Sequence, residues 1–183
     1  MASNSEDTWL DAAYSRFESE GLSAVRVEAI ARDIGATKGS FYWHFGNRQA
    51  LIDAVMARWE REQTDEIIAL ADLGGSPEER MTRLYSIVAT RVEHRSGEAT
   101  LYVEAESEGV ADAVARVSRR RIGYIADILT ELGFARDEAV NRSTIALAAV
   151  LGLQQLVAAT GDAVLGENGR AITESALRMT LAR

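Results

Sequence analysis

The amino-acid sequence predicts an all-α fold, and three observations carry that prediction. The chain of 183 residues contains a single proline, so little in it interrupts a helix. Stretches rich in alanine, leucine, glutamate and arginine place apolar residues three, four and seven positions apart, the spacing of one helix face. Alternating runs of β-branched residues, which would indicate strands, do not occur in the sequence.

The N-terminal part of the chain is expected to form four helices, over residues 8–20, 27–34, 37–45 and 48–70. Leu10 and Phe17 mark the apolar face of the first helix, and Gly21 is its natural stop. Gly35 separates the two short helices. Asn47 is placed to cap the long one, because its side-chain oxygen can accept from a free backbone N–H.

The C-terminal part is expected to form five more helices, over residues 77–95, 98–107, 110–132, 138–159 and 169–181. The clearest break in the chain is "DLGGSPEER", just ahead of the first of them. Ser76 and Glu79 have the spacing of a capping box, and Pro77 falls at the first helical position. About nine helices in all are therefore expected.

The composition excludes several classes of function. The chain is 47% hydrophobic and 26% charged, as in ordinary globular proteins. Cysteine is absent, which excludes disulfides, thiolate nucleophiles and Cys-ligated metals. Only two histidines occur, no His/Asp/Glu cluster has metal-ligand spacing, and "ADLGGSPEER" lacks the lysine of a phosphate-binding loop. We expect no catalytic residues, no metal and no cofactor, and hence no enzyme.

The location of the protein is expected to be cytoplasmic, without a membrane partner. The N-terminus "MASNSEDTWL" lacks the basic and apolar regions of a secretory signal. The most apolar stretch, residues 145–159, contains Gln154 and Gln155 and is shorter than a bilayer span. The formal net charge of −8 argues against a chain coated in nucleic acid but not against a local DNA-reading patch.

The spacing between residues 27 and 45 fits a helix-turn-helix, in which two short helices are joined by a few residues that include a glycine. Gly35 suits the left-handed backbone of such a turn, and Ala31 is small where the second helix crosses the first. Phe41 and Phe45 lie four residues apart and can hold the second helix down. A plain helical hairpin has the same features, so they leave the two alternatives open.

The outward face of the second short helix favours DNA binding. Phe41 and Phe45 point inward in this arrangement, and a solvated helix face rarely carries tyrosine, tryptophan and histidine together. We expect base reading from Thr37, Lys38 and Ser40, since the N-terminal end of this helix enters the major groove.

The remaining residues of "TKGSFYWHF" are given supporting roles at the DNA. Gly39 permits close approach of the backbone. Tyr42 and His44 can donate to phosphates. Trp43 can pack on a sugar-phosphate edge or against the start of the 48–70 helix, and the sequence leaves both possibilities open. Arg48 stands at the positive end of a helix dipole, which is unfavourable unless an anion such as a DNA phosphate sits there.

The segment "AAYSRFESEGLSAVRVEAIARDIGATKGSFYWHFGNRQALIDAV" closely resembles the DNA-binding domain of the tetracycline-repressor (TetR) family of bacterial regulators. The resemblance runs from about Trp9 to Val55, and beyond residue 60 it is only architectural. It implies base-reading roles for Thr37, Lys38 and Ser40 and phosphate roles for Tyr42, His44 and Arg48. The chain departs from the family at Arg26, where Ser or Thr is usual: the side chain keeps a phosphate contact, but the helix cap is lost.

The resemblance also implies a division into a DNA-binding domain over residues 1–52 and a ligand-binding and dimerisation domain over residues 53–183. Small residues let helices approach closely, and those of the last two helices fit either an intramolecular core or a dimer interface. The expected interface residues are Ala148, Gly152, Leu156, Ile172, Ala176 and Met179. The expected ligand-binding residues, each of which also suits a plain core position, are Trp59, Tyr85, His94, Tyr102, Tyr124, Gln154 and Gln155.

Two charge runs remain. Glu104, Glu106 and Glu108 could attract a cationic ligand, and Arg119–Arg121 an anion, although both more often form solvated faces. The function expected from these observations is a ligand-responsive, homodimeric transcriptional regulator. It represses by binding a palindromic double-stranded DNA operator and is released by a small-molecule effector. The alternatives are a DNA-binding regulator without an effector and a helical protein-interaction module.

Overall fold

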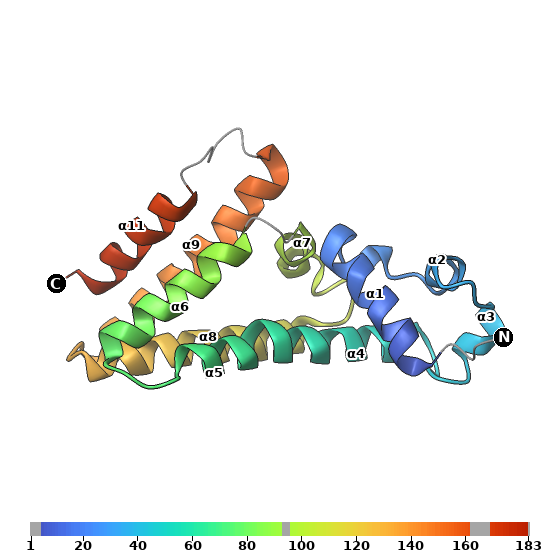
Figure 1. Ribbon diagram of the computed structural model, residues 1–183, viewed down its shortest axis with the longest axis horizontal. Coiled ribbons are helices and arrows are strands. Elements are labelled where there is room, and N and C mark those ends of the chain that lie inside the picture. The colour runs from blue at the N-terminus through green and yellow to red at the C-terminus, as the bar shows by residue number, and fades with distance from the viewer. Residues whose placement is uncertain (1–4, 93–95, 162–168, 183) are drawn as a thin grey trace. The chain divides into compact units, whose positions relative to one another are not determined.

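The computed structural model describes residues 5–92, 96–161 and 169–182, and the regular elements within these ranges are all helical (Figure 1). The predicted all-α fold is confirmed, and each predicted helix has a counterpart. The chain divides into two compact units. Unit 1 comprises Met1–Trp59 and Ser96–Ala113, and unit 2 comprises Glu60–Arg95 and Val114–Arg183. The predicted functional division at residue 52 is a separate question and stays a prediction.

Unit 1 is built from α1 (Glu6–Glu20), the 3₁₀ turn η1 (Leu22–Ala24), α2 (Val27–Asp33), α3 (Lys38–Phe41), most of α4 (Arg48–Glu60) and α7 (Ser96–Glu104). Ser5 caps α1, its hydroxyl accepting from the Thr8 N–H at 3.3 Å. Gly21 ends α1 with a φ of 87°. A Cβ added at Gly21 would lie 2.6 Å from Thr100 Oγ1, so α7 approaches this turn closely.

The core of unit 1 is aromatic where α1 meets α3. Trp9, Phe17 and Phe41 are each at most 1% exposed. The Trp9 and Phe41 rings meet edge to face, with centroids 5.3 Å apart, and Phe45 stacks on Phe41 at 5.6 Å. Phe17 is buried as predicted, but Leu10 is only half-buried, and Trp9 is buried in its place.

Unit 2 is built from the π-helical segment η2 (Arg61–Asp65), α5 (Glu66–Ala71), α6 (Pro77–Val92), all but the first turn of α8 (Ala111–Glu131), α9 (Arg136–Thr160) and α11 (Gly169–Leu181). Helix α6 packs against α5, α9 and α11 (Figure 1). Together with α8 these helices enclose a core that contains Met81, Ile128, Leu129 and Ala139. The single helix predicted over 48–70 is helical throughout, but its π-helical segment was not predicted.

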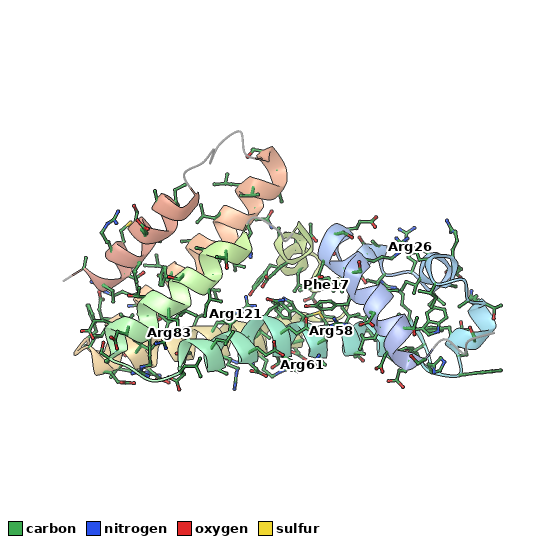
Figure 2. The ribbon with its side chains drawn as sticks, viewed as in Figure 1. Phe17, Arg26, Arg58, Arg61, Arg83 and Arg121 are labelled. Carbon is green, nitrogen blue, oxygen red and sulfur yellow. The ribbon has the colours of Figure 1, made fainter. Side chains whose placement is uncertain are left out.

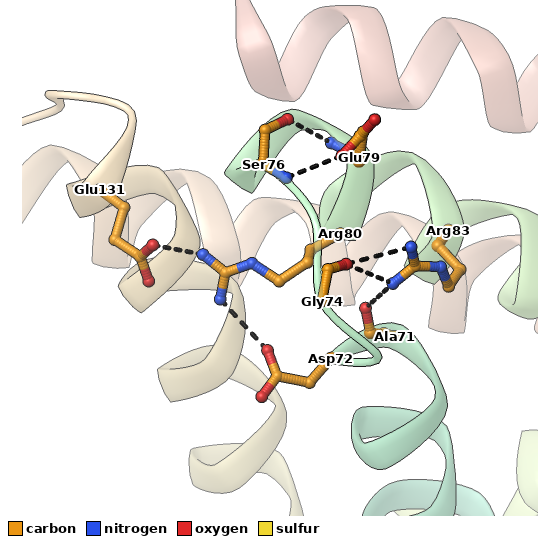
Figure 3. A network of polar contacts seen from close by, with 8 residues as sticks. All are labelled: Ala71, Asp72, Gly74, Ser76, Glu79, Arg80, Arg83 and Glu131. Carbon is orange, nitrogen blue, oxygen red and sulfur yellow. Dashed lines mark hydrogen bonds and ion pairs between the residues drawn. The ribbon is translucent and has the colours of Figure 1, made fainter.

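The turn between α5 and α6 confirms the predicted capping box (Figure 3). The Ser76 N–H donates to the Glu79 carboxylate at 2.8 Å, and the Glu79 N–H donates to the Ser76 hydroxyl at 3.2 Å. Pro77 is the first residue of α6, as predicted. These bonds satisfy backbone groups that the start of a helix leaves without intrahelical partners.

Two arginines of α6 tie this turn to its neighbours (Figure 3). Arg83 donates to the carbonyl of Ala71, the last residue of α5, at 2.6 Å. Arg80 joins Asp72 on one side, at 3.2 Å, to Glu131 at the end of α8 on the other. The turn is thus held by charge-assisted hydrogen bonds, which are stronger than neutral ones.

The π-helical segment η2 buries two polar side chains, Gln63 and Thr64. Arg121 of α8, labelled in Figure 2, donates to the Thr64 hydroxyl at 3.0 Å and to the Gln63 carbonyl at 3.1 Å. Arg120 pairs with Asp65 at 2.7 Å. Two arginines of the 119–121 run therefore support a segment of this unit.

Helix α9 combines length with apolar character. Among the described helices, it alone is long and apolar enough by composition to cross a membrane, with a mean hydropathy of 1.5 over its most apolar window. Only 22% of that window is buried. This is weak evidence for a membrane span, because the core helix of a soluble protein passes the same test.

Candidate nucleic-acid interface

Helices α2 and α3 and the turn between them have helix-turn-helix geometry. Gly35 adopts a φ of 64°, the left-handed conformation expected of it. The turn is closed by the Ala36 N–H, which donates to the Ala31 carbonyl at 2.7 Å. Arg26 occupies the N-cap position of α2 and makes no side-chain cap bond, as predicted (Figure 2). Its Nε instead donates to the Ser23 carbonyl at 3.2 Å.

Helix α3 is shorter than predicted, because only Lys38–Phe41 is α-helical and a turn follows. Thr37 is its N-cap, with the hydroxyl accepting from the Ser40 N–H at 3.2 Å. The Ser40 hydroxyl donates to the Thr37 carbonyl at 2.8 Å. A Cβ at Gly39 would meet nothing nearer than 3.7 Å, so contacts within the protein do not require glycine there.

The side chains around α3 divide sharply by exposure. Phe41 and Phe45 are 0% and 5% exposed, whereas Tyr42 is 55% and Trp43 84% exposed. His44 is half-buried. Because most of the Trp43 side chain is exposed, little of it can pack against the start of α4. That packing was one of the two positions predicted for Trp43. A large aromatic surface on one side of the segment is therefore left uncovered by the residues that the structure describes.

Lys38 has a carboxylate partner that its own segment does not supply. Its Nζ lies 2.5 Å from Oε1 of Glu28 on α2, and the two side chains are 56% and 61% exposed. The hydrogen bond raises the pKa of Lys38 and lowers the pKa of Glu28. The run of sequence around Lys38 lacks acids, yet the helix-turn-helix brings one against it from ten residues earlier.

Arg48 at the start of α4 binds protein oxygens. Its Nε donates to the Val25 carbonyl at 2.7 Å, and Nη2 donates to the Leu22 carbonyl at 2.8 Å. Nη2 also pairs with the carboxylate of Glu108 at 2.8 Å. An anion therefore does stand beside this helix start, and it belongs to the chain itself. A phosphate contact by Arg48 stays a prediction. The predicted Asn47 cap is confirmed by the Ala50 N–H, which donates to Asn47 Oδ1 at 2.9 Å.

The η1 turn ahead of α2 is also held from α7. The Leu22 N–H donates to the carboxylate of Glu104 at 3.1 Å. Glu104 and Glu108 come from the acidic run for which the sequence suggested a cationic ligand or solvent, and both instead hold residues of unit 1. Sequence reasoning missed these contacts, because about sixty residues or more separate the partners.

The predicted ligand-binding residues fall in both units, and each unit is described by itself. Trp59 and Tyr102 belong to unit 1, Tyr85, Tyr124, Gln154 and Gln155 belong to unit 2, and His94 lies outside the described residues. The Tyr85 hydroxyl lies 2.7 Å from Thr180 Oγ1, and burial raises its pKa. Gln155 is exposed. Their ligand-binding roles stay predictions.

The predicted dimer residues are mostly uncovered. Those exposed on α9 and α11 are Ala148, Gly152, Leu156 and Met179. Ile172 is half-buried, and Ala176 packs partly against the core of unit 2. Ile145 continues the exposed α9 residues at 68% exposure.

Comparison with known proteins identifies the N-terminal domain. Residues 10–55 match the family described as "Bacterial regulatory proteins, tetR family". This match covers the N-terminal domain, which is of the TetR type. The match contains α2, the turn and α3 entire, together with Lys38, Tyr42, Trp43 and Arg48.

The curated relatives are transcriptional regulators of the helix-turn-helix type. The HTH-type transcriptional regulator SrpR of Pseudomonas putida is 28% identical over 123 residues, 66% of this chain and 57% of SrpR. The HTH-type transcriptional repressor KstR2 of Mycolicibacterium smegmatis is 27% identical over 106 residues, 58% of this chain and 51% of KstR2. The chain thus spans little more than half the length of these relatives.

Solved structures of transcriptional regulators share the fold over nearly the whole chain. A TetR transcriptional regulator from Legionella pneumophila superposes with a TM-score of 0.76 at 17% identity, covering 94% of this chain and 96% of its own. A transcriptional regulator from Rhodococcus sp. Rha1 gives 0.79 at 20% identity, covering 97% and 96%. At these identities the likeness shows the fold alone.

Proposed function

We propose that this chain is a homodimeric transcriptional regulator that represses genes by binding a palindromic DNA operator and is released by a small-molecule effector. The observation that carries the DNA-binding part is the two-sided segment around α3. Its inward aromatics are buried while Lys38, Tyr42 and Trp43 are exposed, within the span that matches a family of bacterial regulators. In a helix-turn-helix this helix enters the major groove.

The proposed contacts follow from the exposed atoms. Lys38 reads base edges together with the outer sides of Thr37 and Ser40, whose hydroxyls keep spare hydrogen-bonding capacity. Gly39 lets the backbone come near the groove. Tyr42 and His44 donate to phosphates, Arg26 makes a further phosphate contact, and Trp43 packs on a sugar-phosphate edge.

Arg48 takes a different part in this proposal. Its contacts with two carbonyls and with Glu108 support a positioning role: it fixes the η1 turn, and with it the start of α2. The predicted phosphate contact of Arg48 is kept in the proposal as secondary to this positioning role.

The decisive experiment measures DNA binding by the full chain against a genomic fragment library. We expect enriched fragments to contain a palindrome with half-sites about 34–36 Å apart, or a multiple of that distance. Trp43 supplies a second readout. It is 84% exposed, while Trp9 and Trp59 are 0% and 1% exposed. Acrylamide quenching therefore reports mainly on Trp43 and should fall when an enriched fragment is added. No enrichment above a matched library control would refute the DNA-binding proposal.

Tyr42→Phe separates phosphate contacts from base reading. Removing the phenolic hydroxyl should weaken binding to enriched and unrelated DNA by a similar factor, because a phosphate contact carries no sequence information. A loss confined to enriched sequences would assign Tyr42 to base reading instead.

We propose that a second copy of the chain packs against the exposed face of α9 in a homodimer. Ile145, Ala148, Gly152 and Leu156 recur every three or four residues along this face, which is the spacing of a helix–helix seam. Met179 of α11 is 76% exposed. Two-fold pairing of such faces would also match a palindromic operator.

Oligomeric state tests this part directly. Leu156→Asp places a charge in the proposed seam and should give monomers by sedimentation, with helical content unchanged. Leu73→Asp is the matched control, because Leu73 is 73% exposed and lies in the α5–α6 turn. A wild-type chain that sediments as a monomer at micromolar concentration would contradict the proposal.

The proposal of effector release rests on the polar groups set among apolar residues in the C-terminal part of the chain. Tyr85 with Thr180 is the best-defined example. A thermal-shift screen of small molecules, followed by operator binding with each hit, tests it. A hit that raises the melting temperature and lowers operator affinity supports an effector. Hits that leave operator affinity unchanged would favour a regulator without one.

A further inference from the structure

The contact between Glu28 and Lys38 places a hydrogen-bond acceptor beside a donor on the DNA-facing surface. Lys38 is the only lysine of the chain, and Glu28 stands on the other helix of the helix-turn-helix. We infer that Glu28 is a specificity-determining residue that reads DNA jointly with Lys38. This inference rests on the proposed DNA binding and adds to it a residue, an acid, that the sequence analysis did not assign.

Both groups keep hydrogen-bonding capacity after they pair. An ammonium has three N–H donors, and its bond to Glu28 uses one. A carboxylate offers about four lone-pair sites on two oxygens. With side chains 56% and 61% exposed, donor and acceptor reach outward 2.5 Å apart.

A G·C pair fits this arrangement. In the major groove guanine offers two acceptors, N7 and O6, to which lysine donates. Its cytosine partner offers the N4 amino donor, which glutamate accepts. A single G·C pair therefore satisfies both residues without separating them. A reversed pair sets Lys38 against the cytosine amino group and Glu28 against the guanine acceptors, and both contacts are lost.

The carboxylate also changes how Lys38 meets the DNA backbone. An unpaired lysine attracts any phosphate, and such contacts supply most non-specific affinity. Glu28 compensates that charge and repels phosphates in its own right. The pair should therefore reduce binding to unrelated DNA while keeping the base contact. The ratio of specific to non-specific affinity should increase as a result.

A purely structural role predicts a different outcome. Exposed ion pairs contribute little to stability. Helices α2 and α3 are already joined by buried apolar side chains, Ile30 and Phe41 among them. If the pair only tied the helices together, its loss would leave the preferred DNA sequence unaltered.

The test compares full-length wild type with Glu28→Gln and Lys38→Met by selection from random duplex DNA, followed by affinity measurements across salt concentrations. Glu106→Gln is the control, because it makes the same charge change at an exposed residue of unit 1 outside the helix-turn-helix. We expect Glu28→Gln to raise affinity for unrelated DNA about threefold to tenfold and to steepen the salt dependence by up to about one unit of slope. Discrimination at one G·C position per half-site should fall on the order of tenfold in both site variants.

The charge-swapped variant Glu28→Lys with Lys38→Glu sharpens the test, because it keeps an ion pair between the helices while exchanging donor and acceptor. Circular dichroism checks that it folds. We expect its preference at that position to change from G·C to C·G.

The outcomes separate the two proposals. A wild-type chain that enriches no sequence overturns DNA binding itself. A wild-type chain that enriches a sequence overturns the role of Glu28 if Glu28→Gln matches Glu106→Gln in preference and salt slope. The same conclusion follows if the swapped variant selects the wild-type sequence.

Discussion

Two ion pairs of unit 1, Lys38–Glu28 and Arg48–Glu108, are of the same kind but differ in solvent exposure and in their further contacts. Each joins a basic residue at or near the start of a helix to an acid from another element. Lys38–Glu28 is exposed on both sides and makes one contact. Arg48–Glu108 has its acid only 15% exposed, and its guanidinium also binds the carbonyls of Leu22 and Val25.

The difference in exposure between the two pairs assigns one pair to DNA recognition and the other to stability of the fold. Charge pairs in water contribute little to folding, whereas a buried carboxylate that loses its partner is costly. The Arg48 pair therefore holds the η1 turn and the start of α2 in place. The Lys38 pair is available to DNA because the fold does not depend on it.

Arg48→Ala should show the largest effect. It removes the donor from two carbonyls and leaves Glu108 without its cation, so the free energy of unfolding should fall by about 2–4 kcal/mol. Urea denaturation followed by circular dichroism measures it. Arg61→Ala, at an arginine that is 58% exposed, is the control and should change little. Equal effects of the two substitutions would remove the contrast between the pairs.

Gly21→Ala should come next, with a loss of about 1–3 kcal/mol. The new methyl meets Thr100 Oγ1 at 2.6 Å, and the φ of 87° strains any residue with a Cβ. Gly35→Ala isolates the strain, because Gly35 has a φ of 64° but nothing within 4 Å of the added Cβ. We expect Gly21→Ala to be the more destabilising, and equal losses would show that α7 does not press on this turn.

Lys38→Met should have the smallest effect on folding, with the melting temperature unchanged. Its signature is local: without the ammonium, the pKa of Glu28 should rise back toward its ordinary value, measured by NMR titration of the side-chain carboxyl. The sign follows from the lowered folded-state pKa. The small contribution that such an exposed pair makes to folding is present above the unfolded-state pKa of Glu28 and is lost as pH falls through the folded-state pKa. An unmoved Glu28 pKa would show that the two groups do not interact in solution.

Most of the fold follows from local patterns in the sequence. Helix periodicity, the capping box at Ser76 and Glu79, the Asn47 cap and the left-handed Gly35 are short-range features, and all were predicted. The exceptions are also physical. Trp9 rather than Leu10 is buried because its ring packs against Phe41, which lies thirty-two positions further along the chain. The π-helical segment at 61–65 depends on Arg121 of a distant helix.

The candidate site was predictable in its types of residue and less so in their partners. The helical spacing of Phe41 and Phe45, which were expected to point inward, placed Lys38, Tyr42 and Trp43 on the exposed face. The acids that face the basic residues could not be assigned, because Glu28 arrives through the turn and Glu108 from sixty positions away. Spacing along one helix does not reveal contacts made by the fold as a whole.

The solitary lysine has a practical consequence for laboratory chemistry. Amine-reactive dyes, cross-linkers and sensor surfaces target lysine side chains and the terminal amine, and here the only such side chain stands on α3. Immobilisation through amines would therefore mask the surface under study, so attachment should use an engineered tag. The same selectivity means that Lys38 of α3 is the one lysine side chain such a reagent labels, at a position that DNA bound as proposed would shield from the reagent.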